Sequence, residues 1–286
     1  MNVDLFGQEI VTDPLLRDRF IEPPFSVLDS KSSNWVKRKK NWLSKGIKSE
    51  IGRDAKTFGN FTPNKGKKDR FNKLSTSIFD PALAEIIYKW FCVDDGVILD
   101  PFAGGSVRGI VANYLSYNYI GIEIRPEQIE SNREQGREIL SKENQPRWIE
   151  GDSAVVLNDL DIEVDLVFSC PPYADLEVYS DLKGDISNMP YSSFLNSYES
   201  IIKKSCNLLK SGGLACFVVG EVRDKKGCYL GFIPDTIRAF EKCGMRFYNE
   251  AIYLQQLGTA SLRANNNMKS QKLVKVHQNV LVFQKP

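Results

Sequence analysis

The sequence has 286 residues, of which 42% are hydrophobic and 26% are charged, and its formal net charge is +2. These values are typical of a globular protein, and the length suits one large α/β domain with a small extra segment better than two equal domains. No apolar run approaches the roughly 20 residues that span a bilayer, and the first residues lack the blocks of a signal peptide. We therefore expect a cytoplasmic protein with no membrane partner.

The six cysteines are scattered along the chain, without a Cys-x-x-Cys pair. Most of them lie in apolar stretches, where a reduced thiol acts as a small hydrophobic group. We therefore expect neither disulfides nor a bound metal. The single histidine, His277, lies next to an expected strand, and we interpret it as structural rather than catalytic.

Positive charge is concentrated near the N-terminus, where residues 31–73 hold 14 Lys and Arg residues against three acidic ones. Neutralising phosphates supplies most of the sequence-independent affinity for nucleic acid, so this segment is a candidate to meet a polyanion. A solvated run of charges is the alternative interpretation. The candidate nucleic-acid-binding residues are Lys37, Arg38, Lys39, Lys40, Lys67 and Lys68.

Two tryptophans flank the most basic part of this segment. Trp35 and Trp42 are seven residues apart, so they share one face if the segment is helical. That face either docks on the body of the protein or stacks on a base, and docking is the interpretation we favour.

From residue 80 onward the pattern becomes regular. Asp80-Pro81 is typical of a helix cap followed by proline in the first turn, and apolar residues then recur at helical spacing up to Phe91. Strands are expected at about 96–100, 118–123, 147–150, 165–169, 214–219, 246–254 and 278–284. Helices are expected near 106–116, 126–141, 192–210 and 233–243.

This alternation predicts an α/β fold in which a mostly parallel sheet of seven strands has helices on both faces. The last two strands look like a closing pair joined by a long polar loop. We divide the chain into a basic N-terminal arm, residues 1–74, and an α/β domain, residues 75–286. Ligands of such sheets bind beyond the carboxyl ends of the strands, so the residues that follow each strand are the functional candidates.

The first two strands are followed by a glycine-rich turn and by an acidic residue. Gly104 and Gly105 would let the backbone pass close to a ligand, although a tight strand-to-helix turn is the structural alternative. The carboxylate of Glu123 ends the next strand, where it can accept hydrogen bonds from both hydroxyls of a ribose. No phosphate-binding Lys follows the glycines and the turn is not Gly-x-Gly-x-x-Gly, which favours an adenosine-containing ligand without phosphates.

The third and fourth strands end in Asp152 and in Cys170-Pro171-Pro172-Tyr173. Asp152 either accepts from an adenine amino group or caps a surface helix. Two prolines make a stiff turn and remove two donors, which leaves carbonyl groups to accept from a ligand amine, unless the turn is only structural. Tyr173 offers a flat face for a base.

In this order the motifs DPFAGGS, GIE, EGD and SCPPY resemble those of the DNA amino-methyltransferases that make N6-methyladenine or N4-methylcytosine. The resemblance covers residues 75–286, including FDPALAEIIYKWF and KVHQNVLVFQK, and implies a Rossmann-like fold that binds S-adenosylmethionine. The resemblance implies cofactor-binding roles for Asp100, Phe102, Ala103, Gly104, Gly105, Glu123, Asp152 and Ser169. Of these, Glu123 would bind the ribose and Asp152 the adenine.

The same resemblance implies that Cys170, Pro171, Pro172 and Tyr173 hold the target base. A base amine is a poor nucleophile because its lone pair is delocalised into the ring, so acceptors at its hydrogens, with the Pro171 carbonyl first, would favour direct in-line transfer. A base inside a duplex cannot reach the methyl group and would have to be flipped out onto Tyr173.

The chain departs from the family at Cys170, because the family has Asp, Asn or Ser before Pro-Pro-Tyr and a thiol is a weak acceptor. Ser169 lies one place too early and is expected on the opposite face of its strand. The motif therefore leaves adenine and cytosine open. A nucleophilic Cys170 of the cytosine-C5 type is disfavoured, since that family carries Pro-Cys rather than Cys-Pro-Pro.

The order of the motifs leaves no large insert for target recognition. Only the arm and residues 254–277, with Arg263, Lys269, Lys272 and Lys275, are spare, so recognition is expected to be short, relaxed or shared within a homodimer. Residues 20–54 resemble a segment of phage and prophage modification enzymes, which implies viral DNA modification or a restriction-modification system. An RNA base methyltransferase, and a catalytically silent nucleic-acid-binding protein of the same fold, stay open as alternatives.

Overall fold

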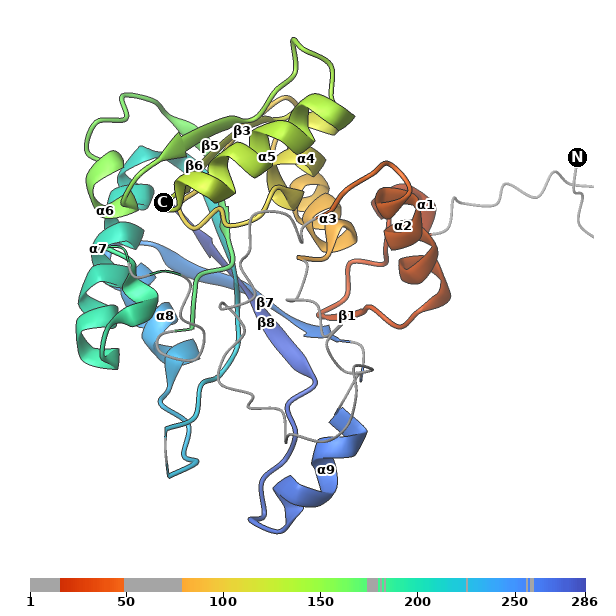
Figure 1. Ribbon diagram of the computed structural model, residues 1–286, viewed down its shortest axis with the longest axis vertical. Helices are drawn as coiled ribbons and strands as arrows, with labels where there is room; N and C mark the ends of the chain where they lie inside the picture. Colours follow the sequence, from red (N-terminus) through yellow and green to blue (C-terminus); the bar gives the residue numbers. More distant parts are fainter. Residues whose placement is uncertain are drawn as a thin grey trace, which may run out of the picture.

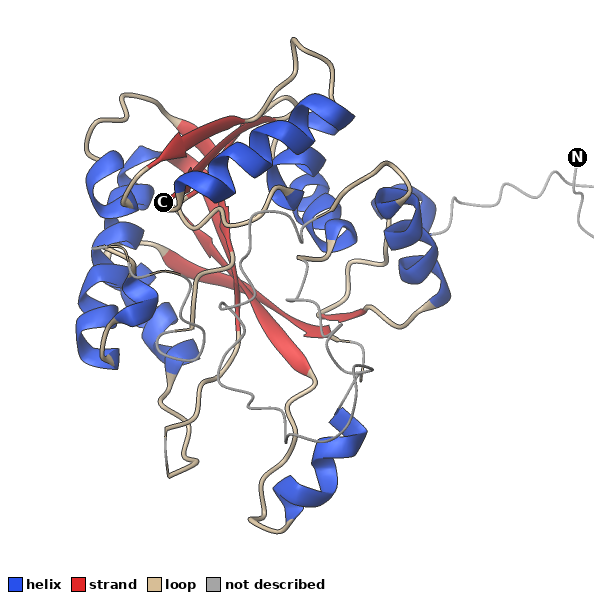
Figure 2. Cartoon of the chain, in the orientation of Figure 1, coloured by secondary structure: helices blue, strands red, loops and turns tan. Residues whose placement is uncertain are grey.

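The computed structural model describes residues 16–48, 79–173, 180, 182, 184–224, 226–255, 257 and 260–286. A twisted sheet with helices packed on it forms the body of the molecule (Figure 2). Its strands are β1 (Val27–Asp29), β2 (Val97–Asp100), β3 (Asn118–Glu123), β4 (Arg147–Glu150), β5 (Val164–Ser169), β6 (Leu209–Val219), β7 (Arg246–Leu254) and β8 (His277–Gln284).

The strand order is β1-β7-β8-β6-β5-β2-β3-β4. Strand β8 is antiparallel to β6 and β7, and every other pair of neighbours is parallel. The α/β fold with a mostly parallel sheet is therefore confirmed, and each of the seven predicted strands is present. The predicted number of strands was one too low. Strand β1 (Val27–Asp29), which lies within the predicted arm, pairs with β7 as an eighth strand.

The helices are α1 (Leu16–Phe20), α2 (Ser33–Leu43), α3 (Pro81–Phe91), α4 (Val107–Tyr114), α5 (Pro126–Ile139), α6 (Ser153–Val156), η3 (Ile186–Asn188), α7 (Tyr191–Leu208), α8 (Phe232–Lys242) and α9 (Ala260–Met268). The predicted start of α3 is confirmed, since the Asp80 carboxylate accepts from the backbone N–H of Ala82 and Pro81 occupies the first turn. No helix among the described residues is long and apolar enough to cross a membrane.

Alternation along the strands creates two cores, one on each face of the sheet. In β5, Leu166 and Phe168 pack into the core that also holds Ile110 of α4, whereas Val167 packs into the core with Phe194 of α7. Helices α2 to α5 contribute to the first core and α7 and α8 to the second. Figure 1 shows these two groups of helices on either side of the sheet.

Helix α2 of the predicted arm is docked on the body. Trp35 and Trp42 are 1% and 4% exposed, which confirms docking rather than base stacking for both rings. Their indole N–H groups donate to carboxylates of α3 and its cap: Trp35 to Asp80 at 3.2 Å, and Trp42 to Glu85 at 2.7 Å. A buried indole needs such a partner, so the two acids set where α2 lies. The boundary expected at residue 74 falls outside the described residues.

The segment between β7 and β8, which the sequence predicts as a long polar loop, includes a helix. It contains α9, which lies beyond the ends of the two strands and away from the other helices (Figure 1). Only Ala260 of this helix is buried. A helix that does not pack on a core needs no apolar repeat, and its sequence has none that would have predicted it.

Candidate active site

A cavity of about 450 Å³ lies at the carboxyl ends of the parallel strands. From β4 through β3, β2 and β5 to β6 the sheet follows the doubly wound order, and its switch point lies between β2 and β5, where such folds bind ligands. Ten of the twelve residues predicted to bind the cofactor or the target base line this cavity. They are Phe102, Ala103, Gly104, Gly105, Glu123, Asp152, Cys170, Pro171, Pro172 and Tyr173.

The other two, Asp100 and Ser169, are fully buried and are not part of the cavity lining. The Asp100 carboxylate accepts from Arg108 Nε at 2.5 Å, from the Tyr119 hydroxyl at 2.7 Å and from the Ser169 hydroxyl at 2.5 Å. It also accepts from the backbone N–H of Phe102 at 3.2 Å. Asp100 therefore stabilises the conformation of the glycine-rich turn from within the protein core.

Arg108 links this carboxylate to the turn itself. Its Nη2 donates to the carbonyls of Phe102 at 2.7 Å and Ala103 at 3.0 Å. Burial alone would lower the pKa of Arg108, but the adjacent Asp100 carboxylate raises it above its ordinary value, so the guanidinium stays charged. Burial, reinforced by the same carboxylate, raises the pKa of Tyr119. The phenol and the guanidinium therefore keep their protons and their hydrogen bonds.

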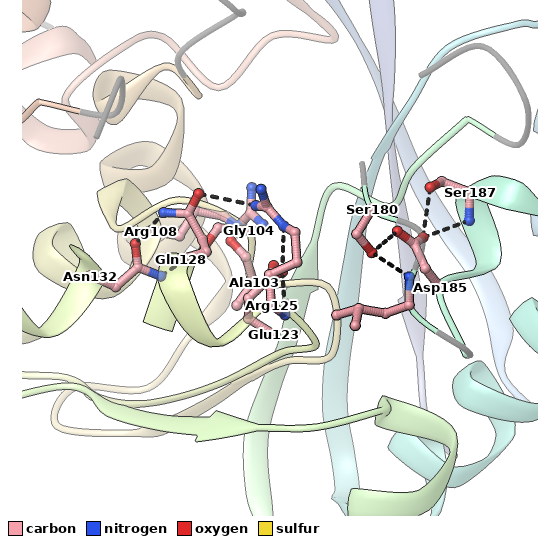
Figure 3. A network of polar contacts seen from close by, with 11 residues as sticks. Ala103, Gly104, Arg108, Glu123, Arg125, Gln128, Asn132, Ser180, Asp185 and Ser187 are labelled. Atoms are coloured by element: carbon pink, nitrogen blue, oxygen red, sulfur yellow. Dashed lines mark hydrogen bonds and ion pairs between the residues drawn. The ribbon is translucent and has the colours of Figure 1, made fainter. Parts of the chain in front are cut away.

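Gly104 has a φ of +53°, in the left-handed region that favours glycine, and its carbonyl accepts from Asn132 Nδ2 at 2.8 Å. Asn132 in turn accepts from Gln128 at 2.9 Å, and Gln128 accepts from Arg125 at 3.0 Å. Figure 3 shows this row of polar side chains running from α5 to the turn. Nothing lies within 4 Å of the point where a Gly104 Cβ would be, so the backbone is open there.

Glu123 ends β3 and begins the same polar row. One of its oxygens, Oε1, accepts from the backbone N–H and the Nε of Arg125, both at 3.0 Å. The two side chains are 9% and 4% exposed, so the ion pair is screened from solvent. With Oε1 occupied by these two donors, the carboxylate is held at the cavity wall in one orientation.

For Asp152 the structure shows the helix cap, one of the two alternatives that the sequence left open, and places the residue on the cavity wall. Its Oδ1 accepts from the backbone N–H of Ala154 at 2.8 Å and caps α6, while the residue also lines the cavity. Gly184 lies close by with a φ of +100°, and a Cβ on it would come within 2.7 Å of Asp152 Oδ2. The carboxylate of Asp185, the next residue, accepts from Ser180 and Ser187 (Figure 3).

The Pro-Pro-Tyr turn leaves β5 and forms another part of the cavity wall. The ring of Tyr173 packs edge-on against Phe232, with centroids 5.9 Å apart and planes at 87°. Its hydroxyl accepts from Gln278 Nε2, and Gln278 Oε1 accepts from Gln255 Nε2 at 3.0 Å. Cys170 is half-buried at the end of the strand. His277, next to Gln278, lies outside the cavity lining, and burial lowers its pKa below the ordinary value.

Of the six cations predicted to bind nucleic acid, the structure describes four, of which two are exposed and two form ion pairs. Lys37 and Lys40 are exposed on α2. Arg38 instead forms an ion pair with Glu85 at 2.7 Å. Lys39 forms an ion pair with Asp80 at 3.1 Å and also lines the cavity. Lys67 and Lys68 lie outside the described residues. Within the part of the chain that the structure describes, no cluster of three or more potential ligands for a metal ion is found.

The sequence motifs do not indicate several polar side chains that the structure places at the site: Arg108, Arg125, Gln128, Asn132, Gln255 and Gln278. Gln128 and Asn132 are four residues apart on α5 and almost fully buried, so they share a face that should be apolar if it only packed on the sheet. Polar residues on the core face of a helix were the signal that could have revealed them.

The family model described as DNA methylase matches residues 18–134, which include α2 and the glycine-rich turn. No significant match to a curated protein sequence is found. Among solved structures, TrmN from Thermus thermophilus is 15% identical with a TM-score of 0.49, and the match covers 72% of this chain and 49% of that chain. Magnesium protoporphyrin IX methyltransferase from Synechocystis PCC 6803 is 12% identical with a TM-score of 0.45, covering 72% and 79%.

A second protein from Thermus thermophilus, described as a candidate DNA modification methylase, is 22% identical with a TM-score of 0.35, covering 47% of this chain and 50% of that chain. This chain thus spans about half the length of each of the two Thermus proteins. The strand order of this chain and the place of its cavity at the switch point are those of a Rossmann-like fold. The family match points to S-adenosylmethionine as the cofactor. Residues 18–134 of this chain are thus similar to the DNA methylase family, and the sheet that carries them has a Rossmann-like strand order.

Proposed function

We propose that the protein transfers a methyl group from S-adenosylmethionine to the exocyclic amine of a DNA base, adenine N6 or cytosine N4. One observation carries the proposal: a single cavity is lined both by the glycine-rich turn with Glu123 and Asp152 and by the Pro-Pro-Tyr turn. Direct transfer requires the methyl donor and the amine to meet in one space that excludes water.

The residues present fit the cofactor. Glu123 would accept from the ribose hydroxyls, since Arg125 holds its carboxylate at the cavity wall. Asp152 also lines the cavity. Its Oδ1 caps α6, so its other oxygen, Oδ2, would accept from the adenine amine. The open backbone at Gly104 suits the methionine part. When bound, S-adenosylmethionine supplies an activated methyl group on a sulfonium.

The Pro-Pro-Tyr turn would hold the target base. Its prolines carry no N–H, so the Pro171 carbonyl can accept from the amine and favour the geometry in which the nitrogen lone pair leaves the ring system. Tyr173 would stack on the base, which a duplex must release by flipping. Cys170 adds little as an acceptor, and adenine and cytosine both satisfy this chemistry.

The strand that carries the base would cross two basic surfaces. Lys37 and Lys40 of α2 are exposed and would contact phosphates, whereas Arg38 and Lys39 chiefly hold α2 on the body through Glu85 and Asp80. The segment between β7 and β8 is the second surface. It carries Arg263, Lys269, Lys272 and Lys275, and no acidic residue occurs from 251 to 286.

The experiment that tests the substrate class is transfer of label from methyl-labelled S-adenosylmethionine to mixed DNA and RNA, followed by nuclease digestion. The proposal predicts label that DNase removes and RNase spares. Label that only RNase removes would make the protein an RNA methyltransferase, and cofactor binding without label in either polymer would make it a silent binding protein. A viral or restriction-modification context, and a homodimer, stay predictions.

A further inference from the structure

Two glutamines from the last two strands reach the cavity beside the Pro-Pro-Tyr turn. Gln255 directly follows β7 and Gln278 lies in β8, and both line the cavity. The backbone N–H of Gln255 donates to the Val276 carbonyl at 2.9 Å, so the two residues stand at the base of the segment that holds α9. Both therefore rest on paired strands rather than on a loose loop, which makes their side chains well positioned.

The two amides form a directed chain of hydrogen bonds that ends on Tyr173. Gln255 Nε2 donates to Gln278 Oε1 at 3.0 Å, and Gln278 Nε2 donates to the Tyr173 hydroxyl. In this arrangement the oxygen of the Gln278 amide faces the nitrogen of the Gln255 amide. Gln278 uses its oxygen and one hydrogen within the chain. Among the described residues, no hydrogen bond reaches Gln255 Oε1, so an acceptor remains at the end of the chain.

The target amine has two hydrogens and calls for two acceptors. The Pro171 carbonyl is one, and the residue before it, Cys170, has only a weakly accepting thiol where Asp, Asn or Ser would accept strongly. An amide oxygen is a strong acceptor, and Gln255 supplies one in the same cavity. Gln278 also holds the hydroxyl of Tyr173 while Phe232 packs on its ring, and two such contacts fix the plane on which a base can stack.

Resting on the proposed function, we propose that Gln255 and Gln278 are specificity-determining residues for the target base. Gln255 Oε1 accepts a hydrogen bond from the base amine. It serves as the second strong acceptor, which the thiol of Cys170 does not provide. Gln278 is a positioning residue, which orients both the Gln255 amide and the ring of Tyr173. The amine that the pair recognises is planar and exocyclic, as on adenine and cytosine.

The test compares Gln255→Leu and Gln278→Leu with the matched control Gln284→Leu, which lies at the other end of β8 outside the cavity lining. Steady-state methylation of DNA gives kcat and KM, and calorimetry gives cofactor affinity. Gln255→Leu removes the hydrogen bond from the reacting base, and Gln278→Leu removes the contacts that orient that acceptor and Tyr173. Each change should lower kcat/KM for DNA about ten-fold or more. Cofactor affinity should stay within about two-fold, and the control should match the wild type.

The conservative variant Gln255→Glu separates an acceptor from mere packing. It keeps an oxygen at this position, and Gln278 can reverse its amide to donate to it, so activity should recover to within about three-fold of wild type above the pKa of a carboxyl group. The inference is overturned if Gln255→Leu keeps its kcat/KM, or if Gln255→Glu is as impaired as Gln255→Leu at every pH. Should Gln255→Leu not fold, Gln278→Leu and Gln255→Glu carry the same test. Absence of any product from the wild type would instead overturn the proposed function.

Discussion

Arg108 Nε lies 2.5 Å from Asp100 Oδ2, in an ion pair whose side chains are 6% and 0% exposed. The pair stands directly beneath the glycine-rich turn, and the Arg108 guanidinium also binds the carbonyls of Phe102 and Ala103. The turn is thus shaped by buried charge as much as by its glycines.

The first prediction concerns this pair. Arg108→Met would leave the Asp100 carboxylate buried without its cation and should lower the free energy of unfolding by about 3–5 kcal/mol, measured by urea denaturation. The exposed pair of Lys242 and Glu199 is the control, and Lys242→Met should cost less than about 1 kcal/mol. Equal losses in the two variants would contradict a stabilising role for the buried pair.

A second prediction separates the exposed from the paired cations of α2. Replacing Lys37 and Lys40 together by Ala should weaken DNA binding and lower the slope of log affinity against log salt by about two, with the melting temperature unchanged. Arg38→Ala should instead lower the melting temperature, since it strips the nearly buried Glu85 of its cation. An unchanged salt slope in the double variant would remove α2 from the DNA-binding surface.

A third prediction tests the expected ribose contact. Glu123→Ala should weaken binding of S-adenosylmethionine about ten-fold or more, as measured by calorimetry, because a buried charged acceptor for two hydroxyls is lost. Glu150, at the end of the neighbouring strand β4, is exposed and provides the control in Glu150→Ala. Cofactor affinity that survives in Glu123→Ala would show that the ribose is bound elsewhere.

The fourth prediction uses the close approach of Gly184 to Asp152. A Cβ at Gly184 would both strain a φ of +100° and come within 2.7 Å of Asp152 Oδ2, so Gly184→Ala should displace that carboxylate and reduce cofactor affinity. Gly212 has a φ of +77° with open space around it and lies outside the cavity lining. Gly212→Ala should therefore cost stability while leaving cofactor affinity as it is.

The strands and the motif residues could be predicted because buried strands and strand-end motifs are local signals. Strand β1 could not, since three residues give no periodicity, and α9 could not, since only Ala260 of it is buried. The position of Asp100 was predicted, but its burial was not: that depends on Arg108, Tyr119 and Ser169, which come from three separate elements. Likewise, Gln255 and Gln278 reach the cavity only through the pairing of β7 with β8.

A fifth prediction concerns the base-binding turn. Tyr173→Ala should abolish methylation and leave cofactor affinity within about two-fold, since the lost ring would stack on the base and not on the cofactor. Full activity in this variant would rule out the stacking role of Tyr173.

The central claim is that one cavity brings S-adenosylmethionine and a DNA base amine together, and nucleoside mass spectrometry of unmodified DNA incubated with the protein and labelled cofactor tests it most directly. The account predicts labelled N6-methyladenine or N4-methylcytosine, and the product names the base. Label on C5 of cytosine, or no labelled nucleoside from a protein that binds the cofactor, would contradict it.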